Sequence, residues 1–160
     1  MLLEFDGGWI EYKKLTLRGF QLFRQGRVLE ALPFHIVRWS EDLPINKNTC
    51  GLLKYVVVEK LKQKLLESVE PIISLDKNIL QRWIKLMIAG TRIKTPDNEI
   101  FEFIRTNYFE FALMFVDHKG NIINLPEKGG LLDQPLDWII FLQMFKVAFV
   151  EELAKQDKGR

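Results

Sequence analysis

The segment that most constrains the fold is an apolar stretch near the C-terminus, preceded by a glycine-rich turn. The turn reads Gly129-Gly130-Leu131-Leu132-Asp133-Gln134-Pro135, and the pattern predicts a helix over about residues 135–154. The paired glycines allow a close backbone turn, Asp133 can cap a helix, and Pro135 suits a first helical turn. Because this helix is apolar almost all round, it needs cover on more than one face, from the rest of the chain or from a partner.

An aromatic stripe follows the predicted helix at i, i+3/i+4 spacing. Its members are Trp138, Phe141, Phe145 and Phe149. One interpretation is a central core helix, and the other is a stripe that docks on a partner, because aromatic residues dominate interface hot spots. Ile36 and Trp39, on a second predicted apolar helix, are further candidates for partner binding, with a core role as the alternative.

The remaining pattern predicts a mainly α protein (α+β) with two small β-hairpins. One hairpin is expected at the N-terminus around Asp6-Gly7-Gly8, and the other over residues 111–125 around a turn that ends in Gly120. Further helices are expected over residues 27–41, 52–69, 75–89 and 95–105, while residues 15–25 fit either a short helix or an extended arm. A chain of 160 residues favours a single domain, residues 1–160, with a weak seam at residues 90–96.

Charge and cysteine content argue against several classes of partner. The chain has 23 basic and 21 acidic residues, and neither half carries the basic stripe that nucleic acid binding needs. A membrane-spanning helix needs about 20 apolar residues, and the apolar stretches of this chain are shorter, so we expect no membrane segment. Cys50 is the single cysteine, which excludes a disulfide within the chain and is compatible with a reducing cytoplasm.

The sequence offers little for catalysis. His35 and His118 are the two histidines, one in a predicted apolar helix and the other in a turn, and a structural role is the simpler interpretation of each. The metal-ligand spacings and phosphate-binding glycine motifs of common enzymes do not occur in the sequence. We therefore expect a protein that is not an enzyme and uses no cofactor or metal. An enzyme assembled from scattered acids would show a metal-dependent activity.

Two parts of the chain together resemble a known family. The first contains Gly8-Trp9-Ile10-Glu11-Tyr12, Leu15-Thr16, an apolar segment read as a helix that ends in Ile36-Val37-Arg38-Trp39-Ser40, then Leu43-Pro44-Ile45 and a helix up to Val69-Glu70-Pro71. This order resembles the small tail assembly chaperones of long-tailed bacteriophages and prophages. The second part, Gly129 to Pro135 with the apolar helix after it, is similar to a signature from phage tail-gene clusters. Residues 76–125 lie outside the resemblance.

The resemblance implies an assembly factor of the host cytoplasm that coats the helical tape measure protein, or another phage structural protein, and forms homo-oligomers. The apolar helix faces would make these contacts. One alternative is a structural virion protein, such as a neck, completion or tail component in a permanent oligomer. Another is a small nucleic-acid-binding regulator that uses Lys60, Lys62 and Lys64, although these lysines also fit a solvated helix face.

Overall fold

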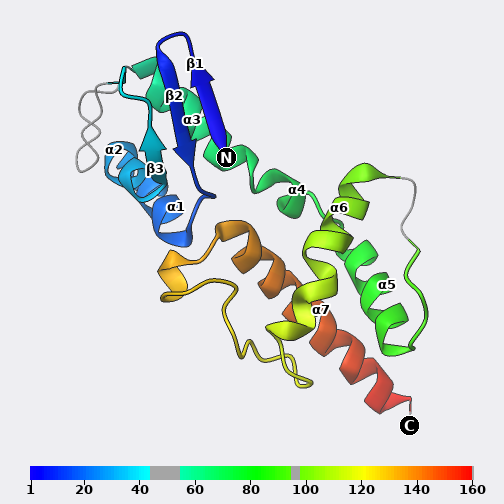
Figure 1. Ribbon diagram of the computed structural model, residues 1–160. Helices are drawn as coiled ribbons and strands as arrows, with labels where there is room; N and C mark the ends of the chain where they lie inside the picture. Colours follow the sequence, from blue (N-terminus) through cyan, green and yellow to red (C-terminus); the bar gives the residue numbers. More distant parts are fainter. Residues whose placement is uncertain (44–54, 95–97, 160) are drawn as a thin grey trace. The chain divides into compact units, whose positions relative to one another are not determined.

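The computed structural model describes residues 1–43, 55–94 and 98–159, and these are mainly helical, with one small sheet (Figure 1). The strands are β1 (Leu2–Phe5), β2 (Gly8–Tyr12) and β3 (Ile36–Trp39). The α-helices are α1 (Leu17–Arg24), α2 (Val28–Ala31), α3 (Tyr55–Glu67), α4 (Glu70–Ile73), α5 (Lys77–Ile88), α6 (Glu99–Asn107) and α7 (Leu136–Lys158). Short 3-10 helices are η1 (Leu32–Phe34), η2 (Phe109–Met114) and η3 (Leu131–Asp133).

The chain forms two compact units. Unit 1 comprises Met1–Glu70 and Glu127–Leu136, and unit 2 comprises Pro71–Pro126 and Asp137–Arg160. The seam considered at residues 90–96 falls inside unit 2, and residues 95 and 96 lie outside the described residues. Whether the chain behaves as a single domain stays a prediction, and each unit is described below by itself.

Unit 1 is built on a three-stranded antiparallel sheet with strand order β1-β2-β3. The expected N-terminal hairpin is confirmed, because Leu3 pairs with Ile10 and Phe5 pairs with Gly8 around the turn. Ser40, just after β3, accepts a hydrogen bond of 3.0 Å from the Trp9 backbone N–H. The buried apolar side chains of this unit come from the sheet, from the segments on either side of α1, from α3 and the residues just after it, and from the start of α7: Leu3, Ile10, Tyr12, Leu15, Ala31, Leu32, Ile36, Val57, Val58, Leu61, Leu65, Val69 and Leu136.

Residues 27–41 do not form the expected continuous helix, and that prediction was wrong. The helix stops after α2, a turn of 3-10 helix follows with Pro33 in it, and the chain then extends as β3. Pro33 has no N–H for helical hydrogen bonding, and the β-branched Ile36 and Val37 favour a strand. Pairing with β2, which places Ile36 opposite Tyr12, completes the sheet.

The helices α1, α3, α5 and α6 agree with the sequence pattern to within a few residues, whereas the short helix α4 was not expected. Thr16 caps α1 by accepting a hydrogen bond from Gly19 N–H, which resolves the choice between helix and arm for residues 15–25. Asp76 caps α5, and Gly90, with a φ of 67°, follows the end of α5 as expected. Residues 52–54 of the predicted third helix lie outside the described residues, and α3 occupies Tyr55–Glu67.

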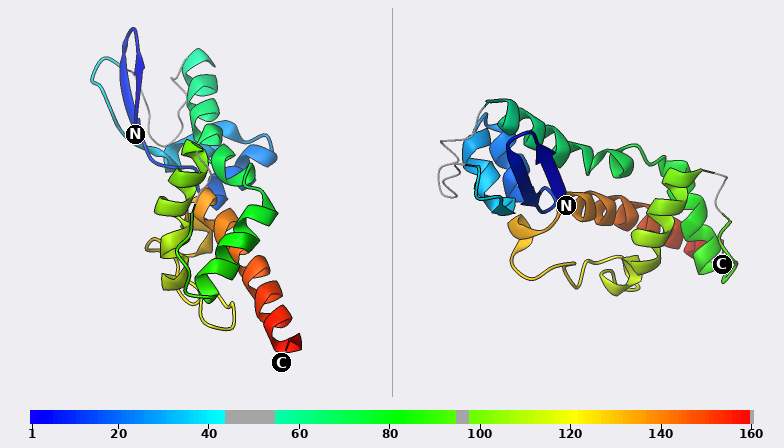
Figure 2. Two further views of the ribbon diagram at one scale, coloured as in Figure 1. Left: turned by 90° about the vertical axis from the view of Figure 1, so that its right-hand side faces the viewer. Right: turned by 45° about the horizontal axis from the view of Figure 1, so that its top comes forward.

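The core of unit 2 lies between α5, α6, η2 and α7, and Figures 1 and 2 show α5 and α6 beside α7 in every view. Its large buried side chains are Trp83, Ile84, Ile104, Tyr108, Phe109, Phe141, Leu142, Phe145 and Phe149. The predicted long C-terminal helix is present as α7. Among the helices described, none is both long enough and apolar enough to span a bilayer.

Around residues 111–125 the structure differs from the expected hairpin. The turn forms, with Gly120 at a φ of 86° and the Asp117 carboxylate accepting backbone N–H bonds from Lys119 and Asn121. Pairing, however, is limited to an isolated bridge between Val116 and Ile122. The residues before the turn form η2, because Phe109, Ala112 and Val116 recur every three to four positions and all point into the core.

Candidate functional site

The aromatic stripe of α7 lies mostly inside unit 2. Phe141 and Phe145 are fully buried and Phe149 is 6% exposed, while Trp138 is half-buried. The ring centroids of Phe145 and Phe149 lie 5.6 Å apart in a stacked arrangement, and those of Phe141 and Phe145 lie 6.2 Å apart. In this conformation three rings of the stripe are core side chains, and Trp138 is the member that reaches the surface. Partner binding through the buried rings would require α7 to leave its neighbours.

Ile36 and Trp39, the other two predicted partner-binding residues, belong to unit 1. Ile36 is 3% exposed and packs inside the unit, whereas Trp39 is half-buried and pairs with Ile10 across the sheet. The six residues singled out from the sequence are therefore divided between two units. Their role in partner binding stays a prediction.

The double-glycine segment has a clear structural role in unit 1. The Gln134 amide is fully buried, and its Oε1 accepts a hydrogen bond of 2.9 Å from Glu127 N–H. Its Nε2 donates to the carbonyls of Glu127, at 2.8 Å, and Gly130, at 3.2 Å. Pro135 forms a bridge to Thr16, the residue that caps α1. The segment thus closes its own loop through Gln134 and fastens that loop to the start of α1.

A cluster of aromatic rings on unit 2 forms the best candidate for a binding surface. Tyr108 lies buried at its centre, with its ring 6.0 Å from Phe103, 4.9 Å from Trp138 and 5.7 Å from Phe141. Phe115 meets Trp138 edge to face at 5.2 Å. We call the three outer rings, Phe103, Phe115 and Trp138, the aromatic patch. Phe103 is 47% exposed and the other two are half-buried, so the patch combines packed rings with open faces.

Exposed aliphatic side chains continue the aromatic patch on both sides. On α6, Ile100 precedes Phe103 by one helical turn and is 53% exposed. On the other side, the carbonyl of Phe115 accepts a hydrogen bond of 2.8 Å from Ile123 N–H, and Met114 is the neighbouring residue. Met114 and Ile123 are both more than half exposed. Exposed apolar side chains are thus present on α6 and around the loop after η2, in addition to the aromatic patch.

A buried hydrogen bond holds the aromatic patch in place. The Tyr108 hydroxyl donates to Asp137 Oδ2 at 2.6 Å, and both residues are almost completely buried. The other oxygen of Asp137 accepts the backbone N–H of Trp138 at 2.7 Å, in the first turn of α7. Burial, followed by the bond to Asp137, raises the pKa of Tyr108, so the phenol stays neutral and able to donate. The Tyr108 and Trp138 rings are consequently held in a defined arrangement.

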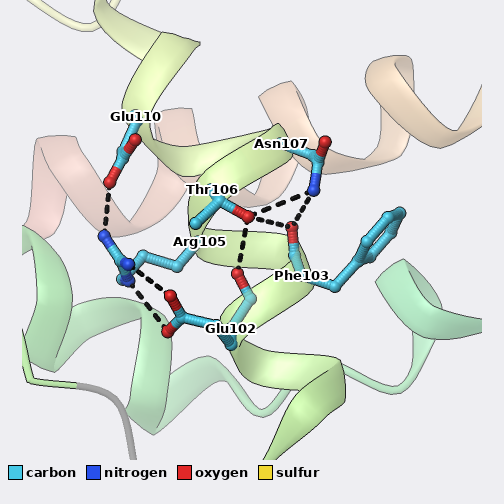
Figure 3. Close-up of polar contacts among 6 residues, drawn as sticks. All are labelled: Glu102, Phe103, Arg105, Thr106, Asn107 and Glu110. Carbon is cyan, nitrogen blue, oxygen red and sulfur yellow. Dashed lines mark hydrogen bonds and ion pairs between the residues drawn. The ribbon is translucent and has the colours of Figure 1, made fainter.

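Charged side chains occupy the other side of α6. Arg105 forms ion pairs with Glu102, at 2.5 Å, and with Glu110 (Figure 3). Hydrogen bonding to Glu102 is the main reason that the pKa of Arg105 is raised. Figure 3 shows Phe103 pointing away from this group. The helix thus separates an apolar side, with Ile100 and Phe103, from a charged side.

Sequence reasoning did not select Phe103, Tyr108 or Phe115. Residues 95–105 were expected to form a helix, but no face of that helix was assigned. The available signal was the pair Ile100 and Phe103, three residues apart, beside the inward-facing Phe101 and Ile104. The contact of Tyr108 with Trp138, 30 positions further along the chain, has no signature in a single sequence.

A second exposed apolar surface lies on α3 in unit 1. Tyr55 and Val56 are 76% and 71% exposed, and they line a shallow hollow of about 910 Å³ together with Lys60, Gln63 and Leu66. The remaining lining is charged and includes Glu59, Lys62 and Glu67. Charged side chains outnumber apolar ones in the lining of this hollow.

Within the described parts of the chain, no group of three or more His, Cys, Asp or Glu side chains is arranged to hold a metal ion. Comparison with known proteins gives no match to a family model, to a curated protein or to a solved structure.

Proposed function

We propose that the chain is a non-enzymatic phage tail assembly chaperone, which binds apolar faces of the helical tape measure protein. The observation that carries the proposal is the aromatic patch, a cluster of ordered rings at the surface of unit 2. Exposed apolar surface of this kind is costly in water and is typical of sites for protein partners. Tryptophan and phenylalanine rings are also the side chains that contribute most at such contacts.

The proposal combines two independent arguments. The resemblance rests on segments of unit 1 and on the double-glycine segment, and it supplies the class of protein. The aromatic patch lies in residues 103–138 and supplies a surface that suits the task. A chaperone of this kind needs many weak apolar contacts along a long client and self-association along it, rather than one tight site.

Size-exclusion chromatography with light scattering tests the proposal. The purified chain is measured alone and mixed with a long helical tape measure fragment encoded beside it. We expect a concentration-dependent oligomer that shifts onto the helical client. Phe103→Ser should weaken this shift, because it removes an exposed ring of the aromatic patch. Phe34→Ser is the matched control, since Phe34 in unit 1 has nearly the same exposed fraction, 46% against 47%.

Other outcomes would favour the alternative functions. A ring-shaped oligomer of fixed size that does not bind the client would indicate a structural virion protein. Such a protein should also be found in purified mature particles. Retention on DNA that falls steeply with added salt would indicate a nucleic-acid-binding regulator. A monomer that binds neither client nor DNA would overturn the chaperone proposal.

A further inference from the structure

We draw no further inference here: the strongest candidate, the exposed apolar surface of unit 2 formed by the aromatic patch with Ile100 of α6, belongs to the site already described, and nothing in the structure shows what covers it.

Discussion

His35, a buried histidine of unit 1, should make the stability of the chain depend on pH. The residue is fully buried between η1 and β3, and its ring lies directly against Gly19 of α1. Burial, with a smaller effect from the positive charge of Lys13, lowers the pKa of His35 from 6.5 to about 4. A backbone hydrogen bond at Lys14 acts in the opposite direction but is the smallest of the three causes. The imidazole is therefore neutral in the folded protein at pH 7.

This lowered pKa makes the stability of unit 1 depend on pH. Between pH 6.5 and about pH 4, the unfolded chain binds a proton at His35 that the folded chain does not bind. The stabilisation is thus fully present above pH 6.5, falls as the pH decreases through this window, and is constant again below it. Because one pKa unit corresponds to about 1.4 kcal/mol, the free energy of unfolding should fall by about 3 kcal/mol.

Urea unfolding at a series of pH values measures this effect, with His35→Leu as the reference. Tryptophan fluorescence follows the unfolding, with Trp9 and Trp39 in unit 1 and Trp83 and Trp138 in unit 2. Other groups that titrate in the same range cancel when the two curves are subtracted. The variant can have a different overall stability, since only the difference in pH dependence matters. Parallel curves for the two proteins, or a His35 resonance that titrates near pH 6.5, would refute the reasoning.

Further substitutions test the packing of the two units. Gly19→Ala should lower the free energy of unfolding by about 1–3 kcal/mol, because the added methyl group would collide with Nε2 of His35. A double-mutant cycle checks this cause, since most of the loss should disappear when Gly19→Ala is made in a His35→Ala background. Gln134→Ala should lower the free energy of unfolding by about 1–3 kcal/mol in chemical denaturation, because three hydrogen bonds from the buried amide to the loop are lost. Unchanged stability would show that the amide does not hold the loop. Phe141→Ala should lower the free energy of unfolding by about 3–5 kcal/mol, measured by thermal or chemical unfolding, because the ring is fully buried. Phe103→Ser should leave the unfolding midpoint nearly unchanged, because that ring is half exposed. Equal losses of stability in the two variants would place both rings in the core.

Local signals explain why much of the fold was predictable. The N-terminal hairpin is marked by adjacent glycines between alternating segments, and α5 ends just before Gly90, which stops helices for reasons of local backbone chemistry. The start of α5 was less well marked, because Asp76 caps the helix and the expected start lay one or two residues earlier. The segment of residues 27–41 failed because its apolar residues fit helix and strand alike. Long-range pairing of Ile36 with Tyr12 decided the outcome, together with Pro33.

The candidate site was less accessible to sequence reasoning. The stripe on α7 indicated important aromatic residues, but periodicity cannot distinguish a core face from a docking face. Packing of Tyr108 and Phe109 against the stripe buries Phe141 and Phe145 and leaves Trp138 near the surface. The aromatic patch depends on contacts between residues far apart in the sequence, and such contacts follow only from the folded chain.

Amide hydrogen exchange of the full chain, with and without the helical tape measure fragment, tests the central claim most directly. If the aromatic patch receives the client, exchange should slow in α6, in the segment from Met114 to Asn124, and at the start of α7. Unit 1 should change much less, apart from any contact between copies of the chain. Slower exchange confined to unit 1, or no change at saturating client, would contradict the account.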